Sequence, residues 1–103
     1  MKIELLHIDE CPNTATALEH LQAALIALHR TDIPINSRLL KSSADTAGTG
    51  FAGSPTITAD GADMFPEAAP SSDLACRIYR TPEGHAGAPT VGQLVEALRN
   101  RGL

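Results

Sequence analysis

The sequence Cys11-Pro12-Asn13-Thr14 lies between a strand-like segment and a helix-like segment, and this arrangement limits the folds open to the chain. Residues 2–9 alternate between polar and apolar side chains, as a half-buried strand does. From residue 14 to residue 30, leucines recur at the spacing of one helical face: Leu18, Leu21, Leu25 and Leu28. We therefore predict an elbow in which a strand ends, Cys11 follows and a helix begins. Pro12 suits the first helical turn, where its missing N–H is not needed.

A cysteine at the start of a helix is a candidate nucleophile. The first N–H groups of a helix have no partner within it, and they stabilise a thiolate that lies beside them. The alternative interpretation of Cys11 is a structural cysteine that ends a strand.

Composition excludes several classes of protein. The chain has 103 residues, enough for one domain. Its net charge is −4 and it has no basic cluster, which argues against nucleic acid and anionic membrane surfaces as partners. No segment approaches the roughly 18 consecutive apolar residues of a membrane span. We therefore expect a single domain over residues 1–103 that binds neither nucleic acid nor membrane.

The first residues lack the apolar core of a signal peptide, because Glu4, His7 and Asp9 interrupt it. A cytoplasmic location is therefore expected. In that reducing compartment, cysteines such as Cys11 and Cys76 are more often catalytic, metal-binding or inert than joined in a structural disulfide. The chain has no zinc-ligand spacing and no phosphate-binding glycine motif, so we expect no resident metal and no cofactor.

Further elements are predicted along the chain. They are a strand over residues 35–41, a poor helical turn near 44–47, a hairpin over 55–65, an irregular segment over 66–89 and a last helix from residue 90. Asp60-Gly61 is a strong hairpin-turn signal. Thr90 and Gln93 form a capping box, and Gly102 is placed to end the last helix.

This order of elements predicts an α/β domain with about four strands in a mixed sheet flanked by three helices. The first two strands enclose a helix, so they should be parallel with a right-handed connection. The hairpin adds two antiparallel strands, and helices cover the sheet to bury its apolar residues.

At this level the chain resembles the thioredoxin fold. The matching features are the elbow at Cys11, the segment Gly53-Ser54-Pro55-Thr56, the Asp60-Gly61 turn and the closing helix. The resemblance implies a cis Ser54–Pro55 bond beside the active cysteine. It also implies that Pro12, Ser54 and Pro55 bind the substrate, with the backbone of Ser54 free to pair with an extended partner segment.

The chain is more closely similar to short bacterial thioredoxin-like proteins. These have a Cys-Pro-Asn elbow and a Cys-Arg-x-Tyr segment, here Cys76-Arg77-Ile78-Tyr79. Such sequences are labelled thioredoxin-like or related to alkylmercury lyase. The resemblance supports the fold more than a function.

One departure from thioredoxin concerns Thr14, which stands where a dithiol oxidoreductase has its second cysteine. The Thr14 hydroxyl is placed to donate a hydrogen bond to a Cys11 thiolate; the alternative is an ordinary helix residue. Cys76 is the only other thiol. Its apolar neighbours favour a buried, inert cysteine. The alternative is a resolving thiol, which requires residues 66–89 to fold over the elbow.

Three functional hypotheses follow. In the first, Cys11 attacks a disulfide or a peroxide; its partner is a small thiol or a protein that carries a thiol or disulfide. In the second, Cys11 and Cys76 bind a soft metal or an organomercurial. In the third, the domain is a non-catalytic binding module that docks through the edge at residues 53–55.

Overall fold

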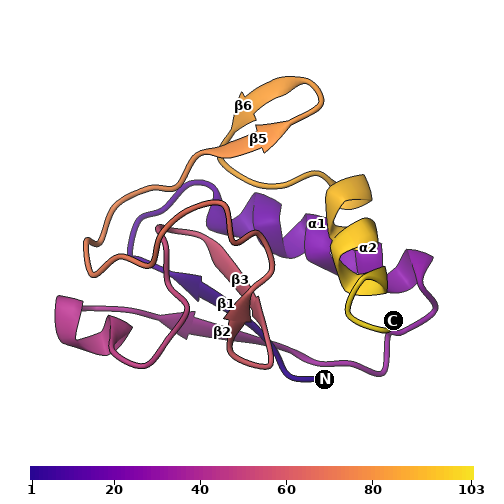
Figure 1. Ribbon diagram of the computed structural model, residues 1–103, viewed down its shortest axis with the longest axis horizontal. Coiled ribbons are helices and arrows are strands. Elements are labelled where there is room, and N and C mark those ends of the chain that lie inside the picture. Colours follow the sequence, from indigo (N-terminus) through magenta and orange to yellow (C-terminus); the bar gives the residue numbers. More distant parts are fainter.

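A four-stranded mixed sheet forms the centre of the domain, which a computed structural model describes over residues 1–103 (Figure 1). Its strands are β1 (Ile3–His7), β2 (Ile35–Leu39), β3 (Thr56–Ala59) and β4 (Ala62–Asp63). They lie in the order β2-β1-β3-β4, with β1 parallel to β2 and antiparallel to β3, and β3 antiparallel to β4. The predicted mixed sheet is confirmed.

Two α-helices, α1 (Thr14–Ala27) and α2 (Val91–Arg99), cover one face of this sheet. Neither helix is long and apolar enough to span a bilayer. The main core lies between helices and sheet, and its largest members are Ile3, Leu5, Leu21, Ile57, Leu94 and Leu98. The alternation of β1 and the leucine spacing of α1 therefore create one shared apolar layer.

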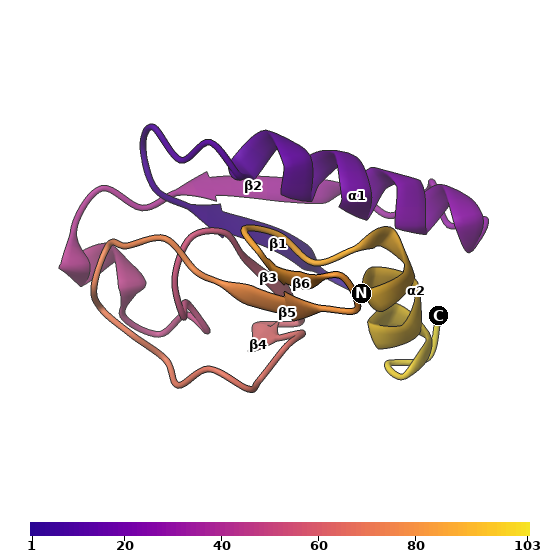
Figure 2. The same cartoon turned by 90° about the horizontal axis from the view of Figure 1, so that it is seen from above.

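The opposite face of the sheet carries a smaller apolar cluster. Leu6, Leu40 and Phe51 form it, and Leu74 packs against it. The third predicted helix is only a four-residue 3-10 helix, η1 (Ser43–Thr46), which lies beyond the end of β2 (Figure 2). Glycines at positions 48 and 50 follow it, and they disfavour a longer helix.

The local turn and cap signals are found where the sequence predicts them. Asp60 and Gly61 join β3 to β4 with φ of 51° and 85°, the left-handed pair that a two-residue hairpin needs. The Thr90 hydroxyl accepts from the Gln93 N–H, and the Gln93 side chain accepts from the Thr90 N–H. The chain turns out of the last helix at Gly102, where φ is 99°.

The prediction that residues 66–89 are irregular throughout is wrong. This segment contains a second hairpin, β5 (Tyr79–Thr81) and β6 (Gly84–Ala86), which forms a separate two-stranded sheet. Figure 1 shows it projecting beyond α1. Gly84 has a φ of 114°, a backbone conformation that residues with a side chain rarely adopt. It therefore allows the tight turn from β5 into β6.

Candidate thiol site

The elbow that carries Cys11 joins the end of β1 to the start of α1. The helix begins at Thr14, so Pro12 lies in the turn before it and not in the first helical turn as predicted. The Thr14 N–H donates to the carbonyl of Cys11 over 3.3 Å. The Cys11 side chain is half-buried and its sulfur is a free thiol.

Ser54 lies directly against the elbow. The Ser54–Pro55 bond is cis, which confirms that prediction. Ser54 is fully buried, and its hydroxyl accepts from the Ile8 N–H over 3.1 Å. The Cys11 thiol faces the carbonyl oxygen of Ser54 at 3.9 Å. The cysteine and the residue before the cis-proline are therefore neighbours.

A segment from Ser71 to Arg77, here called the strap, runs beside residues 51–54. The Ser71 N–H donates to the Phe51 carbonyl over 2.9 Å. Ser54 donates its N–H to Ala75 O and accepts at its carbonyl from the Arg77 N–H, each over 2.8 Å. The prediction that the Ser54 backbone is free for a partner segment is wrong, because the chain's own strap pairs with it.

The strap brings Cys76 to the elbow. Ser54 and Cys76 form a parallel β-bridge, and Cys76 is exposed and free, so the predicted burial of this cysteine is wrong. The Cys76 side chain is among the groups that lower the pKa of Cys11. Cys76 and Cys11 therefore both lie beside Ser54.

The environment of Cys11 favours its thiolate. Partial burial raises the pKa of the thiol, but the nearby polar groups of Ser54, Thr14, the Asn13 backbone and Cys76 together lower that pKa by more. The pKa of Cys11 consequently lies below the ordinary value of 9.0. The Asn13 N–H precedes the first helical residue, which agrees with the expectation that amides at this junction support the anion.

The hydroxyl of Thr14 has few groups near it with which it could form a hydrogen bond. Oγ1 is buried and makes no hydrogen bond of normal geometry within the protein. Its contact with Cys11 is nevertheless among those that lower the pKa of that thiol. A buried hydroxyl without a firm partner is costly, and a thiolate at Cys11 supplies an acceptor.

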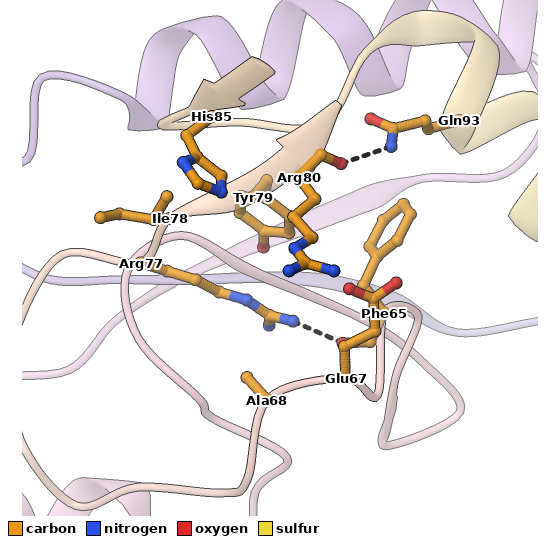
Figure 3. Close-up of a pocket in the computed structure, with 9 residues that line it drawn as sticks. All are labelled: Phe65, Glu67, Ala68, Arg77, Ile78, Tyr79, Arg80, His85 and Gln93. Atoms are coloured by element: carbon orange, nitrogen blue, oxygen red, sulfur yellow. Dashed lines mark hydrogen bonds between the residues drawn. The ribbon is translucent and has the colours of Figure 1, made fainter. Parts of the chain in front are cut away.

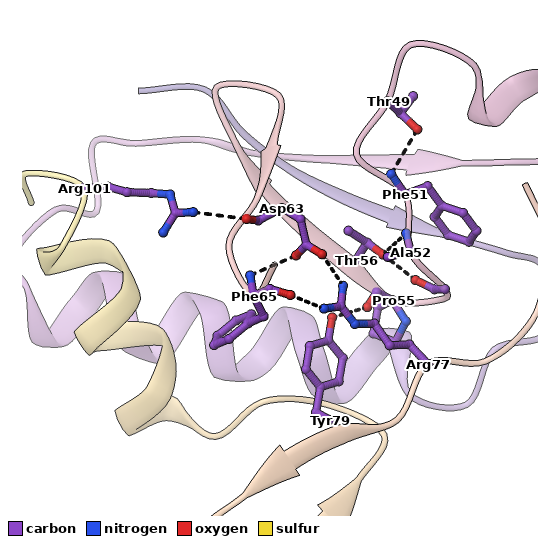
Figure 4. Close-up of polar contacts among 11 residues, drawn as sticks. Thr49, Phe51, Ala52, Pro55, Thr56, Asp63, Phe65, Arg77, Tyr79 and Arg101 are labelled. Carbon is purple, nitrogen blue, oxygen red and sulfur yellow. Dashed lines mark hydrogen bonds and ion pairs between the residues drawn. The ribbon is translucent and has the colours of Figure 1, made fainter. Parts of the chain in front are cut away.

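A buried ionic network anchors the end of the strap (Figure 4). The Arg77 guanidinium donates to the Asp63 carboxylate over 2.8 Å and to the Phe65 carbonyl, and it lies 4.5 Å from the centre of the Tyr79 ring. The two side chains of the ion pair are only 4% and 10% exposed. The Tyr79 hydroxyl donates to the Pro55 carbonyl, which ties the start of β5, just after the strap, to the cis-proline.

The pKa of the Asp63 carboxyl is shifted in opposite directions by its surroundings. Its burial raises the pKa, whereas the Phe65 N–H and the Arg77 charge lower it. Burial prevails, so the pKa lies above the ordinary value of 3.8. The carboxylate therefore depends strongly on Arg77 for compensation.

Gly53 permits the close approach of the strap. Its φ is 111°, and a Cβ at this position would lie 2.8 Å from the Cβ of Arg77. Any other residue would force the two segments apart. This glycine is thus required by the packing of the strap as well as by its own backbone conformation.

No pocket of the structure includes either thiol. A pocket of about 350 Å³ lies beyond the strap, between β5 and the segment after β4, with Phe65, Tyr79 and His85 in its lining (Figure 3). No group of three or more His, Cys, Asp or Glu side chains is placed to hold a metal ion.

Comparison with protein-family models, curated proteins and solved structures finds no match. The class of site is accordingly defined by its geometry alone: a half-buried cysteine at a strand–helix elbow, a cis-proline beside it and a second thiol brought in by a strap.

The sequence-based predictions missed the residues that hold the strap: Asp63, Phe65, Arg77 and Tyr79. The order of apolar residues gave no signal for this set, but the structure shows a regular pattern. From Cys76 to Arg80 the side chains alternate between exposed and buried, with Arg77 and Tyr79 inside. That period of two is typical of an extended segment.

Proposed function

We propose that the protein is a thioredoxin-like thiol–disulfide exchange protein, with Cys11 as nucleophile and Cys76 as resolving thiol. One observation carries this proposal: the strap brings a second free thiol, Cys76, into a β-bridge with Ser54, the residue whose carbonyl faces the Cys11 thiol. The lowered pKa of Cys11 supports its role as the attacking group.

The reaction proceeds in two exchanges. The Cys11 thiolate attacks one sulfur of a disulfide R–S–S–R′, a bond forms between Cys11 and R–S, and R′–S⁻ leaves and takes up a proton. The Cys76 thiolate then attacks the Cys11 sulfur, and R–S⁻ leaves. Overall two protein thiols are oxidised to one disulfide, and one disulfide is reduced to two thiols.

The fold gives independent support to a thioredoxin-like assignment. The thioredoxin fold has the sheet order β2-β1-β3-β4 found here. It also has two helices packed on one face of the sheet, as α1 and α2 are, and a cis-proline beside the cysteine. Thr14 takes the helical position of the usual second cysteine, and Cys76 supplies a thiol from a different direction. The strap also occupies the edge that a binding module would use for docking, so the structure favours exchange chemistry over that alternative.

Oxidised glutathione provides the test. Reduced protein should release two glutathione thiols per chain and finish with an internal Cys11–Cys76 disulfide. The Cys76→Ser variant should release one and retain one glutathione on Cys11, and Cys11→Ser should react slowly. A wild-type protein that keeps glutathione on Cys11, or that is modified first at Cys76, would contradict the assignment of roles. Intact-mass analysis after acid quenching separates these products.

A further inference from the structure

We infer that the disulfides this site accepts are low-molecular-weight ones, because the strap occupies the place in which an extended peptide would bind. This inference rests on the proposed function and narrows its substrate class.

An extended peptide gains affinity at a sheet edge through its main-chain hydrogen bonds. Beside Cys11 those bonds would have to be made with Ser54. Both backbone groups of Ser54 are already used, its N–H by Ala75 and its carbonyl by Arg77. A peptide could pair there only after the strap had left.

The strap is not easily displaced. Its first residue is hydrogen-bonded to Phe51, and Leu74 packs against the second apolar cluster. At its other end, Arg77 is held by the buried Asp63 carboxylate and the Phe65 carbonyl (Figure 4). Removing Arg77 would leave Asp63 buried without its counter-ion, which is unfavourable.

A small disulfide meets no such obstacle. It needs access to the Cys11 sulfur and a path for the leaving thiol; Cys11 is only half-buried and Cys76 is exposed. It does not need a cavity around the reacting sulfur, and no pocket of the structure is lined by either cysteine. The geometry consequently favours disulfides with small groups attached over disulfides within an extended peptide.

Two matched probes test this inference. One is the disulfide of N-acetylcysteine methylamide; the other is the disulfide of a blocked nonapeptide with a central cysteine, so that the reacting groups are alike. The first exchange is isolated in a Cys76→Ser background, where the mixed disulfide on Cys11 accumulates and is followed by intact mass.

The variant Arg77→Ala loosens the end of the strap, and Leu74→Ala loosens its middle. Arg80→Ala is the control, because Arg80 is an exposed neighbour whose guanidinium makes no hydrogen bond or ion pair. We expect the small disulfide to react at least about tenfold faster than the peptide, since the peptide must first break two hydrogen bonds. That ratio should fall in both strap variants and stay unchanged in Arg80→Ala.

Equal rates for the two probes, or a ratio that the strap variants leave unchanged, would overturn the inference. If circular dichroism shows that Arg77→Ala is unfolded, the rate ratio of Leu74→Ala alone tests the inference. A Cys11 that reacts with neither probe would instead contradict the proposed function, and the inference with it.

Discussion

Cys76 lies opposite Ser54 in a parallel β-bridge, while the carbonyl of Ser54 faces the Cys11 thiol at 3.9 Å. One buried residue therefore orders both thiols, although they are far apart in the sequence. The bridge converts a single-cysteine elbow into a two-thiol site without a second cysteine on α1.

The Thr14 hydroxyl is expected to sustain the reactivity of Cys11. Replacing Thr14 with Val removes the hydroxyl, so the pKa of Cys11 should rise toward 9.0. At neutral pH the alkylation rate should then fall several-fold, up to about tenfold, because one pKa unit changes the thiolate fraction tenfold. The measurement is the iodoacetamide rate against pH in a Cys76→Ser background.

Thr16→Val is the matched control, because Thr16 is an exposed residue of the same helix. It should leave the pH profile unchanged. In the parent protein the rate should rise through a midpoint below 9.0, since a lowered pKa exposes the thiolate at lower pH. A Thr14→Val midpoint equal to the parent's would remove Thr14 from the site.

Gly53→Ala should destabilise the fold and displace the strap. The added Cβ meets the Cβ of Arg77 at 2.8 Å, and φ of 111° is unfavourable for alanine. We expect a loss of about 2–4 kcal/mol in the free energy of unfolding, from backbone strain together with overpacking. Urea denaturation measures it.

Gly48→Ala provides the comparison. Gly48 also has a positive φ, 72°, but a Cβ there meets nothing within 4 Å. It should lose only about 1 kcal/mol, the cost of the backbone conformation. Equal losses at the two glycines would show that the strap does not press on Gly53.

The sequence predicts the parts of this fold that depend on neighbouring residues. The Asp60-Gly61 turn and the Thr90 cap are local, and each is found as predicted. The second hairpin was not predicted, because its strands are only three residues long and its prolines and glycines suggest a loop.

Cys76 shows why the site was harder to predict. Its apolar neighbours suggest burial, but Ile78 is 73% exposed and Arg77 is only 6% exposed. Arg77 points inward because its guanidinium donates to Asp63 and Phe65 and lies over the Tyr79 ring. Asp63 and Phe65 lie more than ten residues away in the sequence, so hydrophobicity along the chain does not reveal them.

The Arg77–Asp63 pair should stabilise the domain in a pH-dependent way. Arg77→Met leaves Asp63 buried without its counter-ion, and we expect a loss of about 3–5 kcal/mol at neutral pH. The loss should shrink in acid. The pKa of Asp63 is raised in the folded state, so its penalty is absent below 3.8, grows as pH rises from 3.8 to the folded pKa, and is complete above that pKa.

Denaturation at pH 4 and pH 7 measures this difference. Arg30→Met is the control, because Arg30 pairs with Asp32 at the exposed surface and should matter little at either pH. A loss that is the same at both pH values would show that the cost of Arg77→Met comes from packing and not from the Asp63 charge.

The redox equilibrium of the protein with glutathione tests the central claim most directly. An internal Cys11–Cys76 disulfide forms with release of two glutathione molecules, so its fraction depends on [GSH]²/[GSSG]. When total glutathione is diluted at a constant ratio of the two forms, the oxidised fraction should therefore rise. It should not depend on protein concentration. An oxidised fraction that follows [GSH]/[GSSG], and so stays constant on dilution, would mean that Cys11 only forms a mixed disulfide and that Cys76 is not its partner.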